Sequence, residues 1–212
     1  MRNCLLPVLV LVASSSFATI SQVRSNAIWQ TSSQSSCNVS LSATNASDLI
    51  VVWSYWKTST TNTLTASAKD SLLVPYASAV GPTVQAGSDT AAQIFYLPNV
   101  GMNSSYSVTV SFSGPASVSS GCVIVEYSGA DIYYPLDSVS AGYSTSGNPT
   151  SLMDSGTVAP ANANLLVFGG GTSQRNEFPF TGPNTAAAVE FRTQFVRWLE
   201  SELPRLRDSW RD

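Results

Sequence analysis

Short apolar runs alternate with stretches of Ser, Thr, Asn, Gly and Pro from Ile20 to about Gly171. Tyr106–Phe112 shows the pattern most clearly, because its apolar and hydroxyl side chains fall on opposite faces of an extended chain. Helical spacing is not evident in this region. The pattern therefore predicts an all-β domain, an antiparallel sandwich or barrel. The expected strands are Ile20–Asn26, Asn38–Ser42, Leu49–Trp56, Leu72–Pro75, Ala92–Leu97, Ser107–Phe112, Cys122–Tyr127, Ser151–Val158 and Leu165–Phe168.

Leu49–Trp53 differs from most of these runs because it is apolar at consecutive positions. A strand of this kind is typical of the centre of a sheet that is covered on both faces. The run Cys122–Val125 is equally apolar and is followed by Glu126 and then a Gly turn. We expect both runs to lie in the core of the domain.

The composition changes at Arg175, where charged residues of both signs become frequent. Within this tail, Thr185–Leu203 has apolar side chains at intervals of three and four residues, and Pro204 follows it. This spacing predicts an amphipathic helix that ends before the proline. We therefore expect a charged, partly helical C-terminal tail at 175–212, appended to the β domain.

The N-terminal segment has the features of a secretory signal peptide. Arg2 gives it a positive start, Leu5–Ala13 forms an apolar core, and Ser16–Ala18 supplies small residues before a cleavage point. Cleavage after Ala27 is an alternative, but the earlier position leaves the first expected strand intact. We predict a signal peptide at 1–18.

The apolar core of this segment is shorter than the roughly twenty residues that a membrane-spanning helix needs. An N-terminal anchor or a buried strand is the less favoured interpretation. The mature chain is expected to be a β-sandwich domain at 19–174 followed by the tail, with no membrane span after signal removal. Its predicted location is secreted, extracellular or at the cell surface.

Signal removal takes away Cys4 and leaves one pair of cysteines, Cys37 and Cys122. An even pair in an exported chain indicates a disulfide, because such compartments are oxidising. The alternative is two free buried thiols. A metal site is not expected at two cysteines in a chain without histidine.

Charged residues make up only 11% of the chain and the net charge is −3. A chain without basic excess is not expected to bind nucleic acid or an anionic membrane. The absence of histidine excludes Ser-His-Asp and Cys-His catalytic arrangements. The aspartates also lack the spacing of a calcium loop, so we expect no metal and no cofactor.

Glu126–Asp131, EYSGAD, followed by Pro135–Asp137, PLD, is the most specific motif of the chain. More generic strand motifs are Ile20–Val23, Asp48–Val52, Ala79–Thr83, Gln93–Tyr96, Asn99-Val100 and Asn164–Val167. Together and in this order they resemble an uncharacterised family of secreted bacterial jelly-roll domains, related in architecture to concanavalin-A-like sandwiches. The resemblance covers roughly Ile20–Gly171 and implies an antiparallel jelly-roll β-sandwich.

Members of that family continue past the last strand with a Gly-rich loop and further strands that end near a Trp. This chain has the charged tail from Arg175 instead. We therefore expect a truncation or a frameshift near Arg175, which would leave a sheet edge open for the predicted helix to cover.

Glu126 is the only Glu before the tail. Glycoside hydrolysis needs two carboxyl groups about 5–10 Å apart, and Asp131 or Asp137 is close enough in sequence to be its partner. The favoured alternative is structural: Glu126 ends a strand and, with Ser128, Gly129 and Asp131, shapes the turn that follows.

The aromatic residues near expected strand ends or in expected loops are Trp56, Tyr133, Tyr134 and Tyr143. Exposed rings of this kind can stack on the faces of sugars, so these residues are candidates for a carbohydrate platform. The alternative is that they pack loops over the sandwich. Trp53 and Tyr127 fall within strands and are assigned to the core.

These features favour a secreted, non-catalytic β-sandwich module that binds or adheres at the cell exterior. The expected partner is extracellular polysaccharide or another cell-surface component, an expectation that rests on analogy with other proteins of this architecture. One alternative is a glycoside hydrolase or polysaccharide lyase that uses Glu126 with Asp131 or Asp137. Another is a structural surface module without a ligand.

Overall fold

The computed structural model describes residues 19–84, 89–142, 159, 161, 164–173 and 186–195. The predicted signal peptide, the strand expected at Ser151–Val158 and most of the tail lie outside these residues. Within them every regular element is a β strand, and every strand pair is antiparallel. The prediction of an all-β, antiparallel fold is confirmed.

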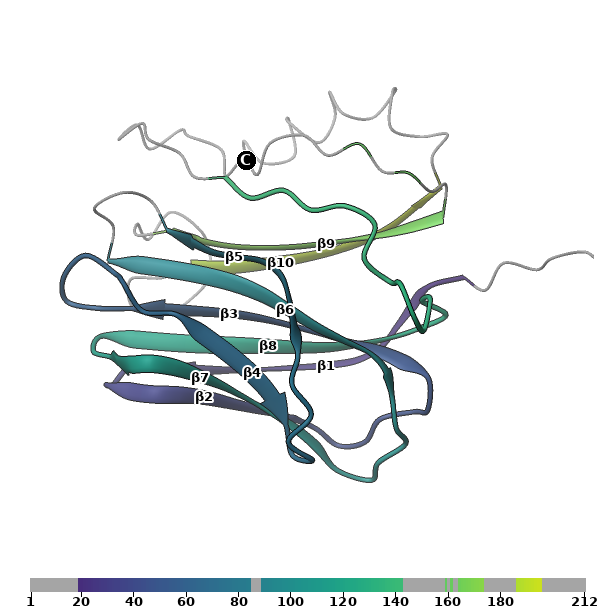
Figure 1. Cartoon of the computed structure of the whole chain (residues 1–212), viewed down its shortest axis with the longest axis horizontal. Coiled ribbons are helices and arrows are strands. Elements are labelled where there is room, and N and C mark those ends of the chain that lie inside the picture. Colours follow the sequence, from purple (N-terminus) through teal and green to yellow (C-terminus); the bar gives the residue numbers. More distant parts are fainter. Residues whose placement is uncertain are drawn as a thin grey trace, which may run out of the picture.

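The strands form three sheets, which lie in layers one above another (Figure 1). The central layer has five strands in the order β1-β8-β3-β6-β5, and a three-stranded sheet in the order β2-β7-β4 packs on one face of it. The central strands are β1 (Ser21–Gln30), β8 (Ser119–Ser128), β3 (Asp48–Lys57), β6 (Thr90–Val100) and β5 (Ala77–Val84). The smaller sheet consists of β2 (Gln34–Leu41), β7 (Tyr106–Ala116) and β4 (Ala66–Asp70).

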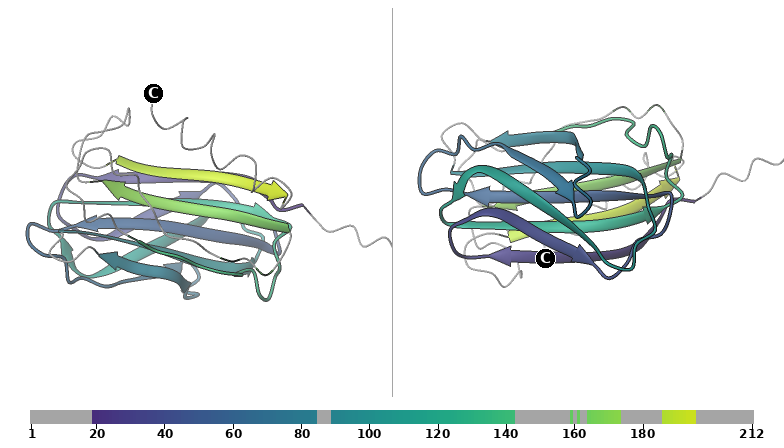
Figure 2. Two further views of the ribbon diagram at one scale, coloured as in Figure 1. Left: turned by 90° about the horizontal axis from the view of Figure 1, so that it is seen from above. Right: turned by 60° about the horizontal axis from the view of Figure 1, so that its bottom comes forward.

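The third layer is the two-stranded ribbon of β9 (Asn164–Ser173) and β10 (Ala186–Phe195). It crosses the face of the central sheet that the three-stranded sheet leaves open (Figure 2). Leu166 and Phe168 of β9 pack on that face. Gly170 approaches it even more closely, because a Cβ atom built on this glycine would lie only 2.2 Å from Cδ1 of Trp53.

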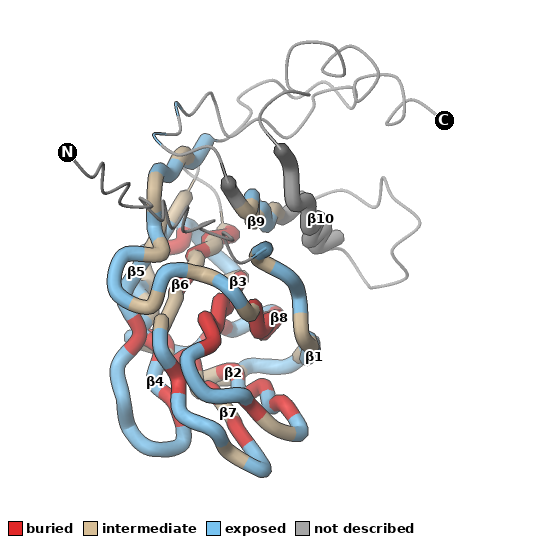
Figure 3. Tube along the Cα trace, turned by 90° about the vertical axis from the view of Figure 1, so that its right-hand side faces the viewer, coloured by how far each residue is buried: buried red, intermediate tan, exposed pale blue. Residues whose placement is uncertain are grey.

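Strands β3 and β8 are buried on both faces as a result (Figure 3). Val52 and Ile124 belong to the core between the two larger sheets, whereas Val51 and Val125 belong to a second core under the ribbon. This result confirms the expectation that Leu49–Trp53 is a central strand covered on each side.

The prediction of a strand at Leu72–Pro75 is wrong, because this segment forms the turn between β4 and β5. Oδ1 of the buried Asp70 accepts hydrogen bonds of 2.8 Å from the backbone N–H groups of both Leu72 and Val74. A carboxylate that captures nearby backbone donors competes with strand pairing. Leu73, at the tip, has a φ of 66°, which lies in the left-handed region rather than in the β region.

The helix expected over Thr185–Leu203 is not confirmed, since Ala186–Phe195 forms strand β10 and the residues after it are not described. Phe191 and Phe195 are four residues apart, a spacing that suits one face of a helix and, being even, also one face of a strand. Pairing along the whole of β9 supplies the backbone partners that make the strand favourable.

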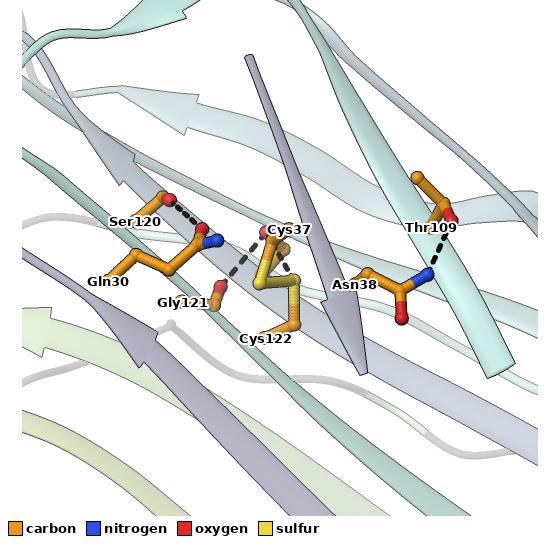
Figure 4. The surroundings of a disulfide bond; sticks show 8 residues. Gln30, Cys37, Asn38, Thr109, Ser120, Gly121 and Cys122 are labelled. Carbon is orange, nitrogen blue, oxygen red and sulfur yellow. Dashed lines mark hydrogen bonds between the residues drawn. A yellow bond between two sulfur atoms is a disulfide. The ribbon is translucent and has the colours of Figure 1, made fainter. Parts of the chain in front are cut away.

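Cys37 and Cys122 form a disulfide, as predicted, so the alternative of two free thiols is wrong. The bond joins β2 of the smaller sheet to β8 of the central sheet, with 6.1 Å between the Cα atoms (Figure 4). Both cysteines are completely buried in the core between these sheets. The disulfide therefore fixes the two layers of the sandwich to each other.

Replacing both Cys37 and Cys122 by Ala is expected to lower the free energy of unfolding by up to about 4.5 kcal/mol. The reason is that the bond closes a loop between residues 85 positions apart and so restricts the unfolded chain. Urea denaturation of the oxidised protein and of the double variant measures the difference. Equal stability of the two proteins would contradict this prediction.

Leu73→Gly is expected to raise the free energy of unfolding by about 1 kcal/mol, because glycine adopts a positive φ without the steric cost that leucine carries. The side chain of Leu73 is 69% exposed, so its removal sacrifices little apolar burial. The matched control is Leu72→Gly, at a neighbouring position that is 65% exposed and has a negative φ. The two variants should differ in urea midpoint, and a control that gains as much stability would refute the explanation.

Candidate functional site

Glu126 lies near the end of β8, on the face that packs toward the three-stranded sheet, and is completely buried. Its Oε1 atom accepts a 2.6 Å hydrogen bond from the backbone N–H of Asn45, and its Oε2 atom lies 2.8 Å from Nε of Arg24. Arg24 also donates a hydrogen bond to the Asn45 side chain. Glu126 thus ties the loop between β2 and β3 to strand β1, rather than the turn that follows at Ser128.

Burial raises the pKa of Glu126, and the neighbouring carboxyl of Asp48 adds to the increase. The Asn45 hydrogen bond and the Arg24 guanidinium act in the opposite direction but do not cancel the effect. A raised carboxyl pKa is a feature of some catalytic acids. Here its causes are core burial and a nearby acidic group.

The proposed catalytic partners of Glu126 lie in a different environment. Asp131 is exposed and Asp137 is half-buried, and each uses its carboxylate to accept backbone hydrogen bonds, Asp137 from Ala161. Glu126 has no exposed surface at all. The structure therefore does not bring Glu126 together with Asp131 or Asp137 at an accessible surface, which a polymeric substrate would require.

Among the candidate aromatic residues that the structure describes, Tyr133 and Tyr134 are the most exposed, at 73% and 86%. Oδ1 of Asp131 accepts hydrogen bonds from both of their backbone N–H groups, at 2.7 and 2.8 Å. These two bonds lower the pKa of Asp131, that from Tyr134 most. The turn begins at Gly129, whose φ of 79° suits a glycine. The two rings thus project from a backbone that one carboxylate holds in place.

Trp56 cannot belong to a carbohydrate platform, and its prediction as a ligand-binding residue is wrong. Its indole is fully buried between the sheets and packs on Phe112, with ring centroids 5.3 Å apart. Its Nε1 donates to the side chain of the buried Asn62. The reason is alternation along β3, because Trp56 falls on the same inward face as Val52.

Tyr143 lies outside the described residues. Trp53 and Tyr127 are buried, as expected.

An aromatic cluster that the sequence did not indicate lies on the outer face of the central sheet. Trp29 on β1, Gly121 on β8 and Tyr55 on β3 stand opposite one another in register. The centroid of Trp29 lies 5.8 Å from that of Tyr55 and 6.2 Å from that of Trp53. Trp29 remains 49% exposed. The first strand that the sequence predicts ends at Asn26, so the sequence does not place Trp29 on a sheet.

Gly121 makes this cluster possible. A Cβ atom at this position would lie 2.3 Å from the Trp29 ring and 2.5 Å from the Tyr55 ring. The missing side chain therefore lets both rings lean over β8 and meet. Nothing in the local sequence shows this contact, because it depends on which residues of three strands stand side by side.

The described part of the chain contains no cluster of three or more His, Cys, Asp or Glu side chains suited to hold a metal ion. The same residues include no helix of the length and apolar character required to span a membrane. The arrangement that remains as a candidate site is a set of exposed aromatic rings on a rigid β scaffold.

Comparison with known proteins finds no matching family model, no matching curated protein and no matching solved structure. The class that the structure defines is a disulfide-linked, all-β protein built from layered antiparallel sheets. Jelly-roll connectivity and the family resemblance stay predictions.

Glu126 is expected to make stability fall as the pH rises. The pKa of Glu126 is raised in the folded protein. In the unfolded chain the carboxyl loses its proton near pH 4.3, whereas in the folded protein it keeps the proton to a higher pH. The stabilising contribution is complete below about pH 4.3 and is lost as the pH passes through the folded pKa. The stability advantage of the wild type over Glu126→Gln should therefore shrink as the pH is raised above about 4.3 in urea denaturation.

Asp131→Asn is the matched comparison, because the pKa of Asp131 is lowered. Its contribution is present above about pH 3.9 and is lost as the pH falls. The two variants should therefore differ from the wild type with opposite pH slopes. A Glu126→Gln difference that does not change with pH would contradict the assignment.

Proposed function

We propose that this protein is an exported, non-catalytic β-sandwich module of the jelly-roll type that binds polysaccharide at the cell exterior. The observation that carries the proposal is the pair of exposed rings, Tyr133 and Tyr134, on a turn held by Asp131. Tyrosine offers a large, rigid contact area with few rotatable bonds and a hydroxyl that forms hydrogen bonds. Such a pair suits a ligand with apolar faces and hydroxyl edges, as a sugar has.

The location and the neutral ligand are supported by independent features. The Cys37–Cys122 disulfide is consistent with an oxidising compartment outside the cytosol. The low charge of the chain disfavours strongly charged partners. A protein with a buried, already paired Glu126 is better suited to hold a polysaccharide than to cleave it.

Tyr133→Ala and Tyr134→Ala are each expected to weaken binding about ten-fold, since truncating an exposed anchoring ring typically costs more than 1 kcal/mol. A glycan array with the purified mature chain identifies the ligand, and titration with that glycan measures the loss. The matched control is Leu136→Ala, an exposed apolar residue of the same segment that lacks a ring.

A wild-type protein that binds no glycan would overturn this proposal and favour a structural surface module. Release of sugar from the bound glycan, abolished by Glu126→Gln, would instead favour the glycoside hydrolase or lyase hypothesis. Equal losses for Tyr133→Ala and Leu136→Ala would show that the aromatic ring is not the recognised feature.

A further inference from the structure

Trp29 differs from the other tryptophans that the structure describes. Trp53 and Trp56 are buried within the two cores, whereas half of the Trp29 side chain faces solvent. It lies near the end of β1, which is an edge strand of the central sheet. The ring is nevertheless held in place, because it leans over Gly121 and packs against Tyr55 and Trp53. It is thus an exposed ring on a fixed support.

Polar groups occupy the next position along the same face. Ser119 stands two residues before Gly121 on β8, and Lys57 two residues after Tyr55 on β3, so both share the face of the aromatic cluster. Ser119 and Lys57 also pair in register. Lys57 is partly exposed, and its ammonium lies 3.5 Å from a carboxylate oxygen of Asp89. The two charges offset each other, so among the described residues this pair offers hydrogen-bonding groups without a net charge.

The buried hydroxyl of Ser119 is a second feature that points to a ligand at this place. It is only 7% exposed, and its hydroxyl has no hydrogen-bond partner among the described residues. A buried hydroxyl without a partner costs free energy, so such a group in a folded protein requires an explanation. A ligand hydroxyl that reaches this point beside Trp29 would satisfy it.

We infer that Trp29, with Ser119 beside it, forms a second sugar-binding site, which takes one pyranose unit of a neutral polysaccharide. The apolar face of the pyranose stacks on the exposed indole, and a ring hydroxyl hydrogen-bonds to Oγ of Ser119. Aromatic surface with a few convergent polar groups is the usual composition of such sites. This inference rests on the proposed function, since it assigns a second contact for the same class of ligand.

A neutral sugar fits this site better than a charged ligand or a protein. The Lys57 ammonium is already paired with Asp89, so it offers no free positive charge to a uronate or a phosphate. One half-exposed ring is also far smaller than the roughly 800 Å² that each partner buries in a stable protein interface. Because the site lies at an edge strand, a long chain can pass across it without entering a closed pocket.

The central test compares Trp29→Ala with Ile28→Ala in the full mature chain. Ile28 is the adjacent exposed residue of β1 and projects to the opposite face of the strand. The probes are three soluble neutral polysaccharides, xyloglucan, galactomannan and dextran, and the acidic alginate, in affinity gel electrophoresis. Trp29→Ala should weaken binding to the neutral polysaccharide that retards the wild type by about ten-fold, and Ile28→Ala should not change it.

Ser119→Ala separates a binding role from a structural one. Removing an unpartnered buried hydroxyl should leave the urea midpoint unchanged or higher. If the hydroxyl bonds to the sugar, the same variant should bind about three- to ten-fold more weakly. A purely structural role predicts no loss of binding.

The two proposals fail in different ways. If Tyr133→Ala and Tyr134→Ala abolish retardation while Trp29→Ala and Ser119→Ala bind as the wild type does, the second site is refuted and the proposed function stands. If the wild type is retarded by none of the neutral polysaccharides, the proposed function fails as well. Preferential retardation by alginate would refute the neutral ligand.

Discussion

The need to bury β3 and β8 on both faces governs the rest of the architecture. Val52 and Ile124 pack toward the three-stranded sheet, whereas Val51 and Val125 on the same strands face the other way. Burying each aliphatic side chain contributes about 1.5–3 kcal/mol, so one open face would leave a large apolar surface in water. Strand β9 covers that face, and the ribbon is therefore part of the core rather than an appendage.

Specific contacts then hold the layers in position. The disulfide joins the two larger sheets through their shared core, and Glu126 ties the loop between β2 and β3 to β1 at one end. The disulfide is fully buried and the Glu126 contacts are partly buried, and each joins segments far apart in the sequence, so they restrict movement of the frame. Exposed groups such as Tyr133 and Trp29 consequently project from a rigid support, which lowers the entropy lost when a ligand binds.

The aromatic residues show where inference from sequence reaches its limit. Trp53 and Trp56 lie on the same strand, yet they point into different cores because β3 alternates between its faces. Trp56 was therefore misplaced as a surface residue, although its strand was predicted correctly. The sequence does not reveal the fixed position of the Trp29 ring. That position depends on Gly121, a residue distant in sequence that stands opposite Trp29 in the sheet. Register between strands carries no local signal.

Periodicity and composition by themselves determined that the described chain is all-β and that Leu49–Trp53 is central, and the cysteine pair indicated the Cys37–Cys122 bond that the structure shows. These features follow from side-chain chemistry that repeats over a few residues, so they can be read locally. Only the tertiary structure decided that Glu126 is buried beside Arg24, that Leu72–Pro75 is a turn and that Ala186–Phe195 is a strand. Each of these outcomes depends on backbone or charge partners, some of them far away in the chain. The paired state has the lower free energy, so it prevails over the secondary structure that the local sequence favours.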